Sequence, residues 1–152
     1  MYFQELSNDS RLWVYQADRS FTEAECQNIS LKLEEFVSGW AAHGASLKAG
    51  AMIVNNHFIV LSVDEKFESA SGCSIDSSVK MIKAIGEQYS INFFNRLKLI
   101  VENDSEMKMI AFSDLGEYGD WNIYNTLVNT VEQFNNSFLI PVKESELYKM
   151  IF

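Results

Sequence analysis

Hydrophobic residues recur at helical spacing in the first third of the chain, directly after a clear start signal. Thr22 and Glu25 have the spacing of a capping box, in which each side chain satisfies a backbone N–H at the start of a helix. The pattern predicts a helix that begins here and ends near Ala42, where His43 and Gly44 supply a stop signal. Its apolar face consists of Cys26, Ile29, Leu33, Phe36, Val37 and Trp40.

Two later stretches have the same periodicity. The first predicts a second helix from about Ser74 to Tyr89. The other follows Asp120, a residue well suited to an N-cap, and predicts a third helix. The apolar positions are Ile75, Val79, Ile82, Ile85 and Tyr89 in the second helix, and Ile123, Leu127, Val131, Phe134 and Phe138 in the third.

Shorter segments rich in β-branched and aromatic residues predict five strands. Only Asn55, Asn56 and His57 separate the second strand from the third, and asparagine tolerates the positive φ that tight hairpin turns need. We therefore expect these two strands to be antiparallel. The five segments are Leu12–Gln16, Ala51–Val54, Phe58–Val63, Leu97–Val101 and Lys108–Phe112.

The first six elements follow the order strand, helix, strand, strand, helix, strand. This is the order of the ferredoxin-like βαββαβ fold. The expected class is therefore α+β, with an antiparallel sheet, both early helices on one face, an extra strand and a C-terminal helix. A doubly wound parallel sheet is the alternative, but it would need a helical crossover where the chain has only three residues. We expect one domain over residues 1–152, with residues 1–10 as a loose arm.

This topology brings two loops to one edge of the sheet. One loop follows the first helix, and the other precedes the second helix and contains the run SGCSID. A helix N-terminus presents free N–H groups and the positive end of the helix dipole, so a small anionic ligand is the candidate occupant. The candidate binding residues are Trp40, His43, Gly44, Asp64, Ser71, Gly72, Cys73, Ser74 and Asp76.

A purely structural role for SGCSID stays open beside the binding role. In that case Ser71 or Ser74 caps the second helix, and Gly72 adopts a strained φ. Cys73 then packs inside as a small hydrophobic residue, as most free cysteines do. The same interpretation makes Trp40 a core residue and His43 a partner of free carbonyl groups at the end of the first helix.

A chemical role is the third alternative. A thiol at a helix N-terminus has a lowered pKa, and a neighbouring imidazolium lowers it further. Cys73 with His43 would then be the catalytic pair of a thiol-dependent enzyme, with Asp76 or Asp64 orienting the histidine. A metal site is disfavoured, because no CxxC or HxxxH spacing occurs.

Composition narrows the range of partners. Twelve Lys and Arg against 21 Asp and Glu give a net charge of −9, which disfavours binding to nucleic acid or anionic membranes. Two cysteines make no disulfide framework, and the N-terminus lacks the features of a signal peptide. No apolar run reaches membrane-spanning length. We therefore expect a cytoplasmic protein without membrane insertion, and no cofactor is indicated.

Three motifs together resemble a family of short bacterial proteins of unknown function. They are FxxxWxAHG from Phe36 to Gly44, SGCSIDSSV from Ser71 to Val79, and FFNR from Phe93 to Arg96. Members of this family often carry the label "ABC transporter ATPase". The residues do not support that activity, because the phosphate-cradling GxxxxGK[ST] loop is absent. The resemblance implies no catalytic residues.

The sequence therefore favours a small binding or interaction domain. Its partner is either a small anionic ligand at the SGCSID edge or another protein. Two helices on one face of the sheet leave the opposite face to be covered, and a homodimer is expected if the third helix does not cover it. The alternative is the thiol-dependent enzyme that uses Cys73 with His43.

Overall fold

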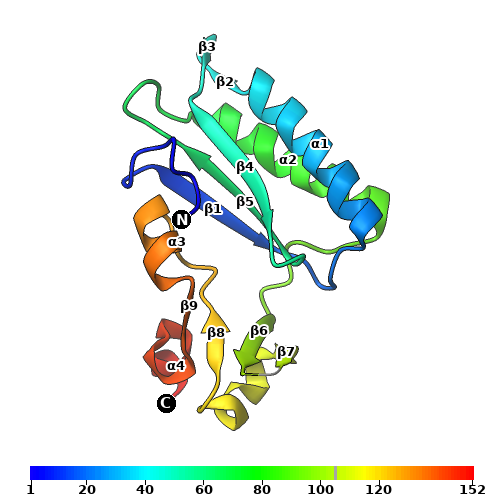
Figure 1. The fold of residues 1–152 in the computed structure, drawn as a ribbon, viewed down its shortest axis with the longest axis vertical. Coiled ribbons are helices and arrows are strands. Elements are labelled where there is room, and N and C mark those ends of the chain that lie inside the picture. Colours follow the sequence, from blue (N-terminus) through cyan, green and yellow to red (C-terminus); the bar gives the residue numbers. More distant parts are fainter. Residues whose placement is uncertain (105) are drawn as a thin grey trace.

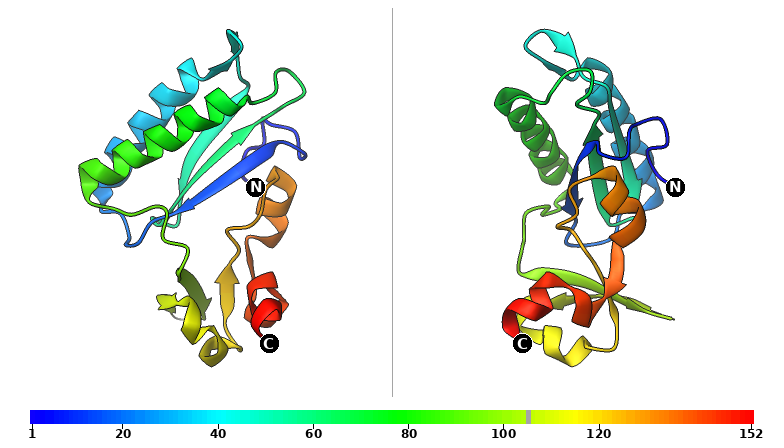
Figure 2. Two further views of the ribbon diagram at one scale, coloured as in Figure 1. Left: turned by 180° about the vertical axis from the view of Figure 1, so that it is seen from behind. Right: turned by 90° about the vertical axis from the view of Figure 1, so that its left-hand side faces the viewer.

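The computed structural model describes residues 1–104 and 106–152, and it places two antiparallel sheets one beyond the other (Figure 1). The first sheet has the strand order β1-β5-β4, formed by β1 (Arg11–Gln16), β4 (Ala49–Val54) and β5 (Phe58–Val63). The helices α1 (Glu23–Gly39) and α2 (Gly72–Tyr89) both cover one face of this sheet (Figure 2). The prediction of a mixed α/β fold with an antiparallel sheet is thus confirmed.

The central strand β5 is buried along its whole length. Ile59, Leu61 and Val63 pack against α1 and α2, whereas Phe58 and Val60 belong to the hydrophobic cluster on the opposite face. This alternation follows from the period of two in a strand. A strand that is apolar on both sides is typical of the middle of a layered fold, which explains the continuous hydrophobic run in its sequence.

The opposite face of the first sheet is covered by α3 (Val131–Ser137) and by the N-terminal residues. Phe3 and Leu6 are buried in that cluster, and the Ser7 N–H donates to Asp64 Oδ2 at 3.1 Å. The prediction of a loose N-terminal arm is therefore wrong. This cover also removes the open sheet face from which a homodimer was expected.

The second sheet has the order β7-β6-β8-β9. Its strands are β6 (Lys98–Asn103), β7 (Glu106–Ala111), β8 (Asn122–Tyr124) and β9 (Leu139–Pro141). Three short helical segments pack around it: η1 (Phe112–Tyr118), η2 (Val142–Glu144) and α4 (Glu146–Ile151). Its buried core contains Leu99, Val101, Ile110, Leu115, Ile123 and Val142.

The position of β6 departs from the ferredoxin-like plan, which would pair it with β1. The outer edge of β1 instead contacts the segment before α3: the Leu12 N–H donates to Asn129 O at 3.0 Å, and Arg11 forms a bridge with Thr130. The strand β6 pairs with β7 and β8 instead, and from β1 the Gln16 side chain donates through Nε2 to Lys98 O at the start of β6. The segment before α3 therefore occupies the edge of β1 that the ferredoxin-like plan would give to β6.

The predicted third helix is wrong over its first half. Ile123 lies in β8, where it pairs with Val101 and Ile140. The helix begins only after Thr130, whose side chain accepts a hydrogen bond from the Gln133 N–H. Leu127, assigned to the helical face from its spacing, is more than half exposed. The apolar spacing of this region therefore combined a strand, a turn and a short helix.

The end of the first helix also differs from the prediction. α1 stops at Gly39, and the chain forms a small hairpin of β2 (Ala41–Ala42) and β3 (Ala45–Ser46). His43 and Gly44 form its turn with φ of 53° and 79°, the two positive values that a type I′ turn requires.

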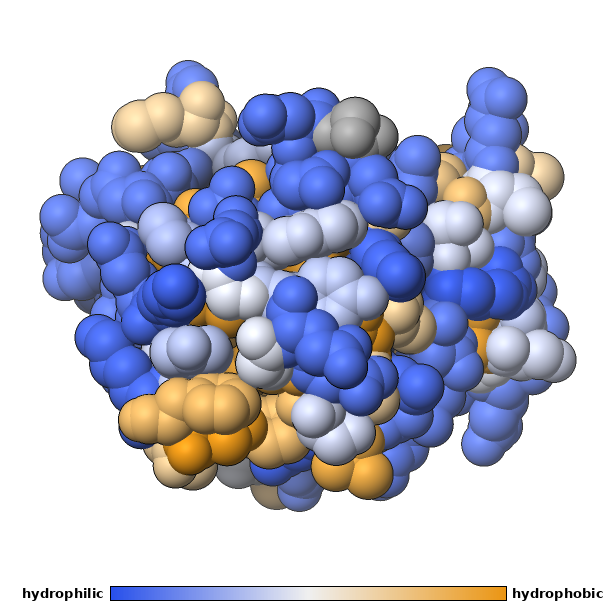
Figure 3. Space-filling model, turned by 90° about the horizontal axis from the view of Figure 1, so that it is seen from below, coloured by the Kyte–Doolittle hydropathy of each residue, from blue (hydrophilic) through white to orange (hydrophobic). Residues whose placement is uncertain are grey.

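The far end of the second sheet carries exposed apolar side chains. Figure 3, a view from this end, shows one large hydrophobic cluster on a mostly hydrophilic surface. Met150, Ile151 and Phe152 at the end of α4 are among the exposed large hydrophobic residues. The Phe152 ring covers Gly116, where an added Cβ would lie 2.7 Å from Phe152 Cζ. None of the described helices has the length and hydrophobicity needed to cross a membrane.

Phe58 gives the most direct test of the layered packing. Its ring is fully buried and lies 5.1 Å, between centroids, from both Tyr124 and Phe138. Phe58→Ala should lower the free energy of unfolding by about 3–5 kcal/mol, because it removes buried apolar contacts and leaves a cavity. Urea denaturation followed by circular dichroism measures this change. Leu31→Ala, at a site that is 64% exposed, should stay within about 0.5 kcal/mol of the parent protein. Equal losses in the two variants would contradict the packing.

Candidate functional site

The two loops that the sequence analysis expected at one edge do meet there. Trp40 Nε1 donates a buried hydrogen bond of 2.8 Å to Ser74 O, which joins the end of α1 to the first turn of α2. Trp40 itself is only 3% exposed and packs against Phe36 and Trp13. The edge is therefore confirmed, but Trp40 serves it as a core residue and not as a binding surface.

The SGCSID run forms the start of α2. Ser71 Oγ accepts from the Ser74 N–H, and Ser74 Oγ accepts from the Ser71 N–H at 2.7 Å and donates to Ser71 O. The two serines thus use their polar atoms on each other's backbone, as in a capping box. Gly72 does not adopt a positive φ, so the expected strain at this glycine is wrong. The local chemistry of the run is that of a helix cap.

The two candidate catalytic residues are both exposed at this edge. Cys73 lies on the first turn of α2, and His43 lies in the turn between β2 and β3, beside Gly44. Asp76 is also exposed. Among the interactions of the described residues, none joins the Cys73 thiol to the His43 imidazole or to a carboxylate. The geometry therefore provides an accessible thiol but no assembled catalytic pair.

Asp64 has a structural task. Its side chain is buried and accepts hydrogen bonds from the Ser7 and Lys66 N–H groups at 3.1 and 3.2 Å. Burial raises the pKa of this carboxyl group, but the hydrogen bonds from Ser7 and Lys66 outweigh burial and the net shift is downward. Asp64 is thus an anionic anchor for the N-terminal residues.

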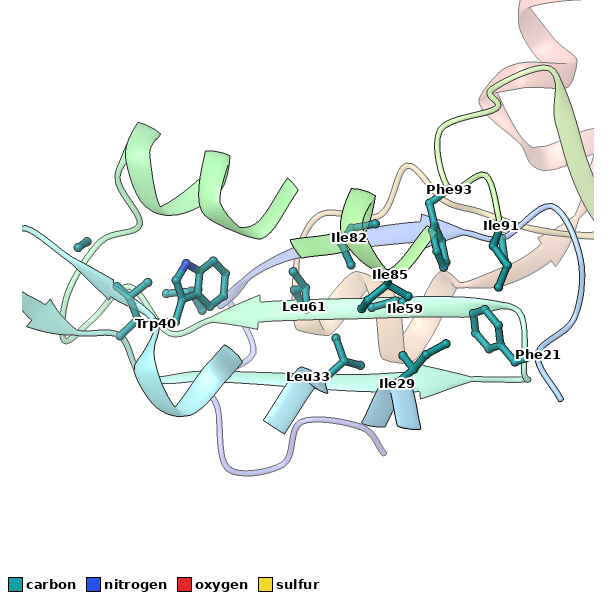
Figure 4. Packing of buried hydrophobic residues seen from close by; sticks show 14 residues of the cluster. Phe21, Ile29, Leu33, Trp40, Ile59, Leu61, Ile82, Ile85, Ile91 and Phe93 are labelled. Carbon is teal, nitrogen blue, oxygen red and sulfur yellow. The ribbon is translucent and has the colours of Figure 1, made fainter. Parts of the chain in front are cut away.

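A cleft lies at the other end of α2, where the sequence had indicated no candidate binding residue. It has a volume of about 390 Å³. Its floor is formed by Ile82, Gly86, Ile91 and Phe93, all of which are buried. Figure 4 shows Ile91 and Phe93 gathered with Phe21 at the end of the layer between helices and sheet, far from Trp40. The cleft therefore opens directly onto the hydrophobic core.

A tight turn after α2 builds one wall of the cleft. Ser90 has a left-handed backbone with φ of 55°, and the N–H groups of Ser90 and Ile91 both donate to Gly86 O. An added Cβ at Gly86 would lie 2.5 Å from Ile91 O, so no larger residue fits there without a shift of the turn. Glycine at this position lets the chain fold back over the helix end.

The turn is tied to the loop between β1 and α1. The Asn92 N–H donates to Asp18 Oδ1 at 3.0 Å, and the Phe94 N–H donates to Asn92 Oδ1 at 2.8 Å. These two bonds hold the backbone of residues 92–94 in place. The wall of the cleft is therefore formed by ordered backbone rather than by side chains alone.

The rim of the cleft is polar and partly aromatic. Asp18, Lys83 and Glu87 are exposed and line the opening. Phe94 is 42% exposed, and Lys83 Nζ lies 5.7 Å from the centre of its ring. An apolar floor with a few polar groups at the mouth is the usual construction of a small-molecule site.

Arg19 fastens the helix ends beside this cleft. Its guanidinium donates to both carboxylate oxygens of Glu25 at 2.8 Å and to Tyr89 O at 2.6 Å. The start of α1 and the end of α2 are thereby joined through one side chain. The hydrogen bonds from Arg19, followed by that from the Thr22 backbone, lower the pKa of Glu25 to about 2.

Sequence reasoning missed most of the cleft, although one signal was present. A glycine inside a helical pattern often marks a close backbone approach, and Gly86 is such a residue. Nothing local could indicate that Asp18, about seventy positions away, closes the opposite side. In the part of the chain that the structure describes, no group of three His, Cys, Asp or Glu side chains is arranged to hold a metal ion.

Thiol accessibility can be tested directly. Cys73 is exposed, whereas Cys26 is half-buried, and burial, followed by the carboxylates of Glu25 and Glu23, raises the pKa of the Cys26 thiol. Iodoacetamide at neutral pH should therefore alkylate Cys73 at least about tenfold faster than Cys26 in the native protein. Mass spectrometry of peptides gives the two rates, and in urea they should converge. Equal native rates would contradict the exposure difference.

The Arg19–Glu25 pair predicts a pH dependence of stability. A carboxyl group whose pKa is lowered by folding stabilises the protein above its unfolded pKa, and this contribution is lost as pH falls through the folded value. Glu25→Gln keeps the cap hydrogen bonds but removes the charge. The melting temperature should drop at pH 7, and the difference from the parent should shrink as pH falls from about 4.5 toward 2. Glu34→Gln, at an exposed position of the same helix, should show no such trend. A difference for Glu25→Gln that stays constant with pH would rule out the charge contribution.

Comparison with known proteins does not add a second line of argument. No protein-family model matches the chain, and no curated protein or solved structure is significantly similar to it. The resemblance to the family of short bacterial proteins therefore stays a prediction.

Proposed function

We propose that this chain is a small binding domain whose ligand site is the cleft at the carboxyl end of α2. The observation that carries the proposal is the combination of an apolar floor with a polar rim around about 390 Å³. Ligand sites of small molecules range from about 300 to 1,000 Å³, so the cleft suits a compact ligand. The wall of the site is preformed by the Gly86 turn and by the Asn92 bond to Asp18.

The SGCSID edge has less support as a binding site for a small anion. Its two serines are occupied by each other's backbone, and Trp40 is buried beneath them. A basic side chain that would attract an anion is not part of the run. The proposed site therefore lies at the opposite end of the same helix.

The exposed Cys73 favours thiol chemistry as a second candidate function. It lies on the first turn of an 18-residue helix, where the thiol is exposed. The candidate partner His43 would have to approach it from the hairpin turn. Thiol chemistry requires that Cys73 be alkylated much faster than a free thiol. The binding function does not require a reactive cysteine.

Filling the cleft tests the proposal. Glu87→Trp places a bulky ring on the rim. The control, Asp76→Trp, also replaces an acidic residue by tryptophan, but near the other end of α2 and outside the lining. The probe is 3-phenylpropan-1-ol, titrated into labelled protein and followed by amide chemical shifts. The parent and Asp76→Trp proteins should show saturable shifts in residues 83–94, and Glu87→Trp should lose them. Shifts that persist in Glu87→Trp, or that are absent from the parent with this probe and with its amine analogue, would refute the site.

A further inference from the structure

We infer that the cleft at the carboxyl end of α2 selects a small organic ammonium ion with an apolar body. This inference rests on the proposed function, since it names the chemical class of ligand for the same site. Three features of the lining favour such a ligand: the helix end, the charges at the rim and the exposed aromatic ring.

The end of α2 favours a positive charge. The last carbonyl groups of a helix carry the negative end of its dipole, and cations are stabilised beside them. α2 has no basic residue in its last turn. A cation from another element already lies at this end, since Arg19 donates to Tyr89 O, and the charge of Arg19 is matched by Glu25. The helix end therefore already binds a cation where one is within reach.

The charges at the rim also favour a positively charged ligand. Asp18 and Glu87 contribute two carboxylates to the lining, against one ammonium group from Lys83. Asp18 Oδ1 accepts the Asn92 N–H, but a carboxylate has further acceptor sites on its second oxygen. The whole chain carries a net charge of −9, which adds a long-range attraction for cations and repels anions.

Phe94 shows how the cleft would hold an ammonium group. Its ring already attracts a cation, because Lys83 Nζ lies 5.7 Å from the ring centre. Tyr15 packs against the same ring edge-to-face at 5.9 Å and keeps it in position. Lys83 is exposed and belongs to α2, so a ligand ammonium can replace its head group while the lysine turns to solvent. The apolar body of the ligand would then lie against Ile91 and Phe93.

This arrangement predicts that substitutions at the rim change the affinity for an ammonium ion in opposite directions. Phe94→Leu should weaken ammonium binding, because it removes the π-face but keeps an apolar wall. Asp18→Asn with Glu87→Gln should weaken it too, and asparagine still accepts the Asn92 N–H. Lys83→Gln should strengthen it, because it removes the competing cation. If Lys83 had only a structural role, its replacement would not increase the affinity for the ammonium ion.

The experiment compares two probes of nearly equal shape, 3-phenylpropylamine and 3-phenylpropan-1-ol, by calorimetry and amide chemical shifts at low salt. The amine should bind about fivefold tighter than the alcohol, and its advantage should fall as salt is raised. In Lys83→Gln the amine should gain about twofold, and in the Asp18→Asn, Glu87→Gln protein the advantage over the alcohol should disappear. The alcohol should bind all of these variants with similar affinity.

The outcomes separate the inference from the proposed function. Equal binding of both probes to the cleft would overturn the ammonium preference and leave the binding site intact. Tighter binding of 3-phenylpropionate, the matching anion, would overturn it as well. If neither amine nor alcohol shifts residues 83–94, the proposed site itself fails. Melting temperatures of the variants close to that of the parent show that the loss or gain belongs to the site.

Discussion

Burial of β5 on both of its faces is the constraint on which the rest of the structure depends. Its six residues are all buried, and alternate side chains supply the centres of two separate hydrophobic clusters. One cluster binds α1 and α2 to the first sheet. The other binds α3, the N-terminal residues and, through Ile100 and Tyr124, the second sheet. Since apolar burial is the main source of stability, one strand thus holds all the layers together.

The cleft is a consequence of how α2 ends on this framework. The helix lies on the sheet through Ile82 and Ile85, and the chain then folds back against the helix end before it reaches β6. Gly86 permits the tight return, and Ile91 and Phe93 fill the end of the core. The space above them stays open, and the exposed Asp18, Lys83 and Glu87 line its mouth. A stable turn and an open hollow therefore arise from the same few residues.

The SGCSID run and the cleft illustrate two kinds of evidence. The run is conspicuous in sequence because it joins a cysteine, a glycine and two serines, yet its serines mainly satisfy backbone groups at the start of α2. The cleft is inconspicuous because its residues come from the loop after β1, from α2 and from the segment that follows α2. A composition that stands out locally is often a cap or a turn. A binding site needs convergence of elements, which local composition does not reveal.

The sequence by itself determined the elements whose signals are local. The capping box of Thr22 and Glu25, the apolar faces of α1 and α2, and the strand Phe58–Val63 all follow from residues within a few turns of one another. Only the tertiary structure decided where β6 pairs, how the region after Asp120 divides into β8 and α3, and that Phe3 and Leu6 are buried. These outcomes depend on competition between distant segments for the same strand edge and the same apolar face. The physical reason is that hydrogen-bond ladders and hydrophobic contacts accept many partners, and only the assembled chain selects among them.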